Sequence, residues 1–459
     1  MHLSVLQNPQ LAGDAMRSWR TRGALDEISR DVLGGSFLSM ALRIGGLALS
    51  YLANIFLSRL LGIHGYGQYV VALGWTVVLV LPARAGFENS ALRYVTIHLE
   101  HGEAGPLRGF IRVAVGTVVV LSVLMGIGMA LFGQAAQLGT AHWAMPAAAL
   151  LILPLALLGV LSPMMRTARR IFASQFYDQI LRPFLLILLL GIAALSASSL
   201  TAPMALLLSA LAAFLALAAL GIHFRRVFVP ATDQKADYSS WRRWFALSLP
   251  LLVIGTTQEL MNQMEVLLLG ALAGAKEAAL FAAAWRLASL TPFALSALTA
   301  IGGPLIASAY HRNARDELNH VAKLVARVGL AFAVAASIVL LVAGKWLLGL
   351  FGPEFPSAYG VVALLLVGGL VNAFTGIVGY LMVLTGRERP ALAIFGGSLV
   401  LSIGLNLLLI PGFGAMGAAV ASSSATAMWN LAMLVYVRRV IGIDASAVSL
   451  KPRSPVTER

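Results

Sequence analysis

The chain has 459 residues, of which 59% are hydrophobic and only 11% are charged, and it carries a formal net charge of +14. Soluble domains carry about 25% charged residues, so this composition excludes an ordinary soluble protein of this length. The sequence contains no cysteine, which excludes disulfides and thiolate metal sites.

The apolar residues form long runs rather than the short alternating segments of a membrane β-barrel. A bilayer core of about 30 Å needs roughly 20 apolar residues in a helix. The first 35 residues lack the apolar core of a signal peptide, so the first run is expected to remain as helix one. Twelve spans are predicted, at about residues 37–60, 66–86, 110–132, 145–165, 180–198, 203–223, 246–270, 279–301, 322–343, 359–384, 391–410 and 416–437.

The lysines and arginines of the short loops predict the orientation of these spans. With the N-terminus in the cytoplasm, nearly all of them fall on the cytoplasmic side. Only Arg59, Lys276 and Lys345 face the opposite side, and Arg43 and Arg286 lie within spans. This asymmetry predicts that both termini are cytoplasmic, and it explains the net charge without a nucleic-acid partner.

Internal similarity predicts a two-fold repeat of six-helix units. The stretch LLGIHGYGQYVVA (60–72) pairs with LAGAKEAALFAAA (272–284), and TARRIFA (167–173) pairs with TGRERPA (385–391) at nearly the same offset. An even helix count gives both copies one orientation, related by an axis along the membrane normal. The expected organisation is a cytoplasmic N-terminal segment (1–35), an N-lobe (36–223), a cytoplasmic linker (224–244), a C-lobe (245–438) and a cytoplasmic tail (439–459).

Few ionisable groups lie within the spans, where they are costly and usually face an interior or a water-filled cavity. Arg43 either faces an anionic substrate or reaches the cytoplasmic headgroups. Arg59 is expected at the outer mouth of the N-lobe. Glu259, Asn262 and Gln263 share one face of span seven. Glu259 is therefore either an ion-coupling acid or a neutral group hydrogen-bonded between helices.

Glu265 and Arg286 lie at similar distances from the turn between spans seven and eight. A buried ion pair between them is the simplest expectation, since an unpaired buried charge is costly. Alternatively, Arg286 is a substrate ligand that Glu265 releases on protonation. The small residues of AMGAAVASSSA (415–425) are expected only to allow close helix packing, and interhelical hydrogen bonds are expected from Asn54, Asn372, Asn406 and Asn430.

The sequence holds no phosphate-binding glycine loop with lysine, no HExxH and no GxSxG. We therefore predict that the protein is not an enzyme, with no catalytic residue, metal or cofactor. A membrane polymerase or ligase would usually carry large outer loops with catalytic residues, and every predicted outer loop here is short.

Four stretches resemble the polysaccharide flippase family, the O-antigen and exopolysaccharide translocases of the multidrug/oligosaccharidyl-lipid/polysaccharide exporter superfamily. That family usually has Asp where Glu265 stands and Tyr where Phe281 stands, so a membrane-embedded acid is carried over to Glu265. The lipid II flippases of the same superfamily typically have two additional helices, which disfavours that branch. The stretches are LSRLLGIHGYGQYVVAL (57–73), RAGFENSALRYVTIHLEHGE (84–103), TARRIFASQFYDQILRP (167–183) and NQMEVLLLGALAGAKEAALFAAAWRL (262–287).

The resemblance implies an all-α, V-shaped, alternating-access transporter of the bacterial inner membrane. It would move a polyprenyl-pyrophosphate-linked oligosaccharide to the outer leaflet during lipopolysaccharide or exopolysaccharide biosynthesis, coupled to an ion gradient. Membrane lipids and polysaccharide polymerase or other assembly proteins would be its partners. The candidate residues are Arg43, Arg59 and Arg286 as cavity cations, Glu259 and Glu265 as ion-coupling acids, and Asn262 and Gln263 as polar lining. A multidrug or cation antiporter of the same architecture is the alternative.

Overall fold

The computed structural model describes residues 22–135, 144–168, 170–196, 200–229, 234–312 and 314–448, without the side chains of 22–37 and of some helix positions, mostly within 250–304. Every regular element within these ranges is helical. The elements are α2 (Arg22–Arg84), α3 (Phe87–Glu100), α4 (Ala104–Ala135), α5 (Met145–Ala149), α6 (Ile152–Thr167), α7 (Ile171–Gln175), η3 (Phe176–Leu181), α8 (Arg182–Ser196), α9 (Ala202–Phe228), α10 (Trp241–Leu272), α11 (Ala275–Ala288), α12 (Leu290–His311), α13 (Arg315–Gly349), η5 (Phe355–Ala358), α14 (Tyr359–Thr375), α15 (Val378–Leu384), α16 (Glu388–Tyr436) and η6 (Val437–Ile441).

Eight segments of the described chain are long and apolar enough to cross a membrane. The two longest, Leu38–Glu100 and Glu388–Ile441, have 63 and 54 residues, far more than the roughly 20 that one crossing needs. Non-helical backbone at Gly62 (φ 65°) and Gly414 (φ 53°) breaks α2 and α16, so each of these two elements consists of two helices joined at a kink. The total of twelve spans stays a prediction.

One helix break coincides with a predicted span end, and another falls inside a predicted span. Span two was expected to end near residue 86, and the helix does break there, at Ala85 (φ 51°) and Gly86 (φ 74°), before the chain continues as a separate helix, α3, to Glu100. Pro82 lies inside α2 just before this break. The predicted eighth span is divided at Ser289, three residues before Pro292, into α11 and α12.

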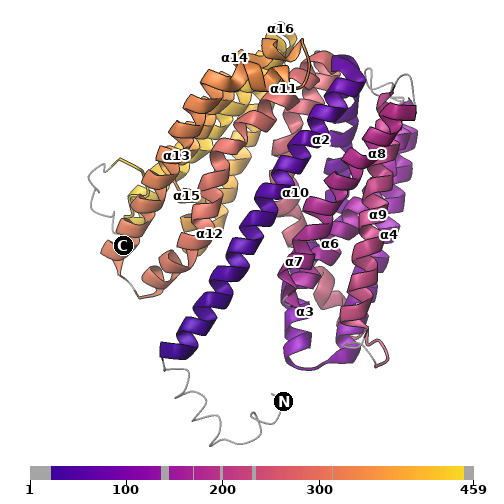
Figure 1. Ribbon diagram of the computed structural model, residues 1–459. Coiled ribbons are helices and arrows are strands. Elements are labelled where there is room, and N and C mark those ends of the chain that lie inside the picture. The colour runs from indigo at the N-terminus through magenta and orange to yellow at the C-terminus, as the bar shows by residue number, and fades with distance from the viewer. Residues whose placement is uncertain are drawn as a thin grey trace, which may run out of the picture.

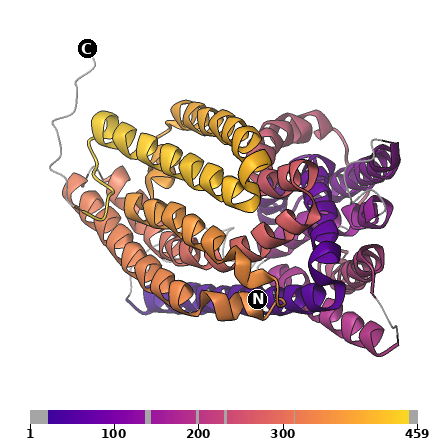
Figure 2. The same cartoon turned by 90° about the horizontal axis from the view of Figure 1, so that it is seen from above.

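Two groups of helices lie close together at one end, the closed end, and diverge toward the other, the open end (Figure 1). We call the group α2–α9 the N-lobe and the group α11–η6 the C-lobe. Figure 2 shows the same division from above, with the later helices on one side and the earlier ones on the other. Helix α2 begins and η6 ends toward the open end, and in this view the first half of α2 crosses diagonally in front of the two groups (Figure 1).

The lobes meet along a seam of small residues. A Cβ added to Gly67 would lie 1.8 Å from the carbonyl oxygen of Ala275, at the start of α11. One turn further along α2, Val71 fills the space beside Gly270, whose added Cβ would lie 2.6 Å from it. Small residues allow helix backbones to approach this closely in membranes, so the closed end is packed backbone against backbone.

Helix α10 contacts both lobes. Near its start, Trp244 is fully buried and its ring lies edge-on to Phe110 of α4, with centroids 5.5 Å apart. Ser248 donates a 2.7 Å hydrogen bond to Ser90 of α3. The far half of α10 packs against α11 and α16. The first half of a helix predicted to belong to the C-lobe is thus attached to the N-lobe.

Candidate functional site

Arg43 lies in a cavity of about 310 Å³ on the N-lobe, between the first half of α2 and the segment η3–α8. Gly46 permits this arrangement, because a Cβ there would lie 2.7 Å from the backbone oxygen of Gln179. Asp178 and Arg182 complete the charged lining. The sequence singled out Arg43, and the fold adds two charged residues from a segment more than a hundred residues later.

The charges of this cavity do not cancel. Arg182 Nε donates to Asp178 Oδ1 at 2.9 Å, so these two groups form an ion pair. Arg43 has no ion pair or hydrogen bond with any residue that the structure describes, and Arg166 lies close enough for its charge to act on that of Arg43. An arginine within a membrane span needs water or an anion to solvate it, so the cavity is suited to an anion.

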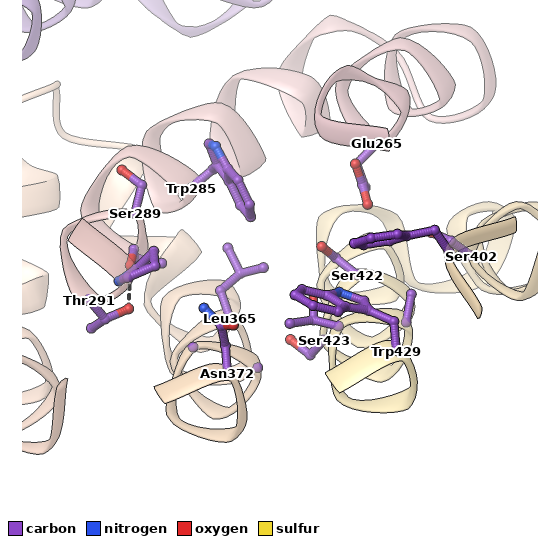
Figure 3. Close-up of a pocket in the computed structure, with 17 residues that line it drawn as sticks. Glu265, Trp285, Ser289, Thr291, Leu365, Asn372, Ser402, Ser422, Ser423 and Trp429 are labelled. Atoms are coloured by element: carbon purple, nitrogen blue, oxygen red, sulfur yellow. Dashed lines mark hydrogen bonds between the residues drawn. The ribbon is translucent and has the colours of Figure 1, made fainter. Parts of the chain in front are cut away.

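A second cavity, of about 450 Å³, lies among the C-lobe helices and contains Glu265 (Figure 3). Glu265 is only 6% exposed, and its carboxylate points from α10 toward Ser422 of α16 (Figure 3). Besides small and aliphatic residues, the lining supplies hydroxyls, an amide and aromatic rings. They include Asn372, Ser402, Ser423, Thr426, Trp285, Phe395 and Trp429.

The chemistry of this cavity favours a cation or a proton. Hydroxyl, amide and carboxylate oxygens are the ligands that hard cations prefer, and aromatic faces attract organic cations. No group of three or more histidine, aspartate or glutamate side chains that could hold a metal occurs in the described chain. A cation in this cavity would therefore rely on Glu265 and on neutral oxygens.

The expected ion pair between Glu265 and Arg286 is not formed in the described structure. Arg286 Nε instead donates to Tyr66 Oη at 3.2 Å, and this hydroxyl donates to Asn54 Oδ1 at 3.2 Å. Because Tyr66 and Asn54 belong to α2, Arg286 connects the C-lobe to the N-lobe.

Arg59 also makes a contact between the lobes. Its Nε and Nη2 donate to the carbonyl oxygens of Leu350 and Gly349 at 2.7 and 2.8 Å. These carbonyls end α13, where free acceptors attract cations. Arg59 and Arg286 thus lie at the closed end, apart from Arg43.

Glu259 and Gln263 lie on α10 beside the seam. Gln263 Nε2 donates to Glu259 Oε1 at 3.1 Å, and Gln263 Oε1 lies 3.8 Å from the position of a Cβ on Gly74. The side chain of Asn262 lies outside the described residues. Of the polar face predicted for span seven, the side chain of Gln263 therefore points toward α2.

Sequence reasoning missed several lining residues. Ser422 and Ser423 were expected only to allow packing, yet they line the Glu265 cavity. Trp285 and Trp429 also line it, although nothing in their spacing pointed to a site. The i, i+4 spacing of Asp178 and Arg182 was a usable signal, because that spacing places both side chains on one helix face.

Comparison with known proteins identifies the family. A family model described as "Polysaccharide biosynthesis protein" matches residues 32–297, which is more than half of the chain. The chain belongs to this family. No curated protein matches it significantly.

Three solved structures show a similar fold. A multidrug resistance MATE family transporter of the MOP superfamily, inward-facing, has a TM-score of 0.68 at 14% identity, covering 88% of this chain and 97% of its own. The lipid II flippase MurJ, inward closed, has a TM-score of 0.67 at 10% identity, covering 88% of this chain and 87% of its own. A MOP superfamily transporter from Pyrococcus furiosus, described as having a binding pocket of reverse polarity, has a TM-score of 0.61 at 16% identity. The match covers 89% of this chain and 95% of that transporter.

These similarities confirm an all-helical fold shared with the V-shaped MOP superfamily transporters. Together with the eight apolar segments, they identify a multi-pass membrane protein. The three similar structures are those of two transporters and a flippase.

Proposed function

We propose that this protein is a flippase that moves a polyprenyl-pyrophosphate-linked oligosaccharide from the cytoplasmic to the outer leaflet of the bacterial inner membrane. The product would serve lipopolysaccharide or exopolysaccharide synthesis, and an associated polymerase would receive it. Family membership supports a role in polysaccharide biosynthesis, and one site observation supports the substrate class.

That observation is the unpaired charge of Arg43 in the N-lobe cavity. A pyrophosphate link is the charged part of the proposed substrate, and the forked guanidinium of arginine matches phosphate oxygens. The sugars would occupy the polar space between the lobes, while the polyprenyl chain stays in the bilayer. Arg59 and Arg286 would act at the closed end, where they hold the lobes together.

Glu265 is proposed to couple transport to an ion gradient. Its cavity holds one buried carboxylate surrounded by oxygen ligands, and it lies in the lobe opposite Arg43. Glu259, hydrogen-bonded to Gln263 beside the seam, is the second candidate. Binding of a proton or a small cation at either residue would change the charge next to the helices that move.

The membrane orientation proposed here places the open end in the cytoplasm. Lysines and arginines are concentrated in the loops on the side of the two termini, as the positive-inside rule expects for a cytoplasmic face. The first described helix begins, and the last one ends, toward the open end (Figure 1). The cavity of Arg43 would then be reached from the leaflet in which lipid-linked sugars are made.

A multidrug or cation antiporter remains the second candidate, and the Glu265 cavity favours it. Trp285 and Trp429 flank a single buried acid, an arrangement that suits an organic cation. This function predicts Glu265-dependent uptake of a cationic dye and no movement of lipid-linked sugars.

The two functions are separated by proteoliposomes that contain either a labelled polyprenyl-pyrophosphate oligosaccharide or a cationic dye. The flippase predicts that Arg43→Ala lowers oligosaccharide flipping roughly 10-fold or more, as loss of a charged hydrogen bond implies. Arg43→Lys should retain part of the activity. Arg93→Ala, an exposed arginine of α3, is the matched control and should flip normally.

Glu265→Gln should abolish the dependence of flipping on an ion gradient. If the Arg43, Arg286 and Glu265 variants all transport normally at normal expression, the assignment of the sites is wrong. Dye transport without flipping would support the antiporter instead.

A further inference from the structure

A second basic cavity, of about 480 Å³, lies on the N-lobe between η3 and the last turns of α9. Arg170 and Arg226 supply its charge, and Tyr177 and His223 supply further polar groups. No carboxylate lines it among the residues that the structure describes. Neither arginine forms an ion pair with a described residue, so the described part of the cavity has a net positive charge.

The polar groups of the cavity are pre-arranged. Tyr177 Oη and His223 Nδ1 lie 3.0 Å apart in a hydrogen bond, with the two rings nearly perpendicular at 79°. When Tyr177 donates this bond, the imidazole carries its proton on Nε2 and can donate it to an anion. The cavity then offers an imidazole donor together with two guanidinium groups.

The surroundings of the cavity are apolar and exposed. Ile222, which lines it, is 58% exposed, and Phe172, which is 47% exposed, stacks on Phe176, whose ring contacts that of Tyr177. Helices α8 and α9 lie on the side of the N-lobe that faces away from α12 and α13 (Figure 1). Arg226 belongs to the last turn of α9, beyond the apolar part of this helix, which places the cavity at the membrane interface.

We propose that this cavity binds the headgroup phosphate of an anionic phospholipid from the leaflet on the side of the two chain termini. Arg170 and Arg226 would hold the phosphate, His223 would donate to it, and the acyl chains would lie on Ile222 and Phe172. Basic pockets between membrane helices are recognised as sites for such headgroups. The inference does not depend on which substrate the protein transports.

The site also connects with the Arg43 cavity through one turn of π-helix. Tyr177 of η3 faces the phospholipid cavity, whereas Asp178 and Gln179 of the same turn line the cavity of Arg43. Turns of π-helix occur frequently at functional sites. A bound phospholipid would therefore fix the turn that carries part of the N-lobe cavity.

The experiment measures lipid binding to the purified full-length protein in detergent by native mass spectrometry and thermal unfolding. The probes are phosphatidylglycerol, phosphatidylcholine and inorganic phosphate. Each arginine near the headgroups is worth about a 5-fold factor in affinity, so the Arg170→Gln/Arg226→Gln protein should bind phosphatidylglycerol roughly 10- to 30-fold more weakly. Phosphatidylcholine should bind weakly to every variant.

The matched control is Arg93→Gln/Arg389→Gln, which removes two exposed arginines outside any cavity described above and should leave binding unchanged. Should the double variant fail to fold, Arg226→Gln alone is expected to weaken binding about 5-fold, and Tyr177→Phe should also weaken it. Equal binding of phosphatidylglycerol by all folded variants would overturn the proposal. Stabilisation by inorganic phosphate equal to that by phosphatidylglycerol would also overturn it, because the cavity would then be a site for soluble phosphate.

Discussion

The seam between α2 and α11 leaves no space for a side chain at Gly67, and Gly67→Ala therefore tests how the lobes are held together. A Cβ on Gly67 would lie 1.8 Å from the carbonyl oxygen of Ala275, whereas real Cβ contacts essentially never fall below 3.0 Å. The two helices must separate by about 1.2 Å at this point. Overpacking of this kind costs about 1–3 kcal/mol.

The cost falls only on the conformation in which the closed end is packed. If the lobes separate there during transport, the substitution shifts the population toward the separated state by a factor of roughly 5 to 150. Gly116→Ala is the matched control, since nothing lies within 4 Å of an added Cβ at that helical position. This control should leave the conformation unchanged.

Pulsed EPR distances measure the shift, and the absence of native cysteine allows labelling without background. His64→Cys and Ser357→Cys place labels on exposed residues at the closed end, one on each lobe. We expect a longer distance component to grow in the Gly67→Ala protein and not in the Gly116→Ala protein. An unchanged distance distribution in a folded Gly67→Ala protein would refute the role assigned to the seam.

Two further substitutions test other contacts of the closed end. Tyr66→Phe removes the hydroxyl that accepts a hydrogen bond from Arg286. It should lower the free energy of unfolding by about 1–2 kcal/mol and lengthen the same EPR distance. Tyr359→Phe, the control, removes a hydrogen bond within the C-lobe and should not change that distance. Glu277→Gln weakens the 2.7 Å hydrogen bond that Glu277 accepts from the backbone N–H of Ala415. It should lower the free energy of unfolding by about 1 kcal/mol, measured as a lower thermal unfolding temperature. The affinity for lipid should not change.

The repeated architecture was predictable because it depends on local backbone geometry. The matched stretches place Gly62 and Gly274 at equivalent turns, and the two residues share their backbone conformation, with φ/ψ of 65°/177° and 90°/176°. Only glycine adopts this region readily. The second match is also confirmed, since α6 and α15 end, and α7 and α16 begin, at corresponding positions.

The partners of the buried charges were not predictable in the same way. Distance from a turn gives the depth of Glu265 and Arg286, but the direction of each side chain around its helix depends on how the lobes pack. Arg286 faces α2 and bonds Tyr66, while Glu265 faces α16 (Figure 3). Of the expected interhelical amides, Asn430 accepts a bond from Thr375 of α14 as predicted.

The prediction for Asn406 was wrong for a related reason. Its amide N–H groups bond to Ser402 on the same helix, at 2.9 Å to the carbonyl oxygen and 3.2 Å to the hydroxyl. A serine one turn earlier satisfies the amide locally, so no second helix is needed. Sequence alone identified a polar residue in an apolar helix, but not the nearer partner.

The two lobes share turn geometry but differ in the chemistry of their cavities, with Arg43 in one and Glu265 in the other. Helix α10 physically connects them. Glu265 lies in its far half, and Trp244 in its first half is packed into the N-lobe against Phe110. Because Trp244 anchors α10 in the N-lobe, a change in the tilt of α10 caused by occupation of the Glu265 cavity would also move the N-lobe helices packed against Trp244. Under the proposed function, an ion in the C-lobe could therefore act on an anion in the N-lobe through α10, without contact between the two ligands.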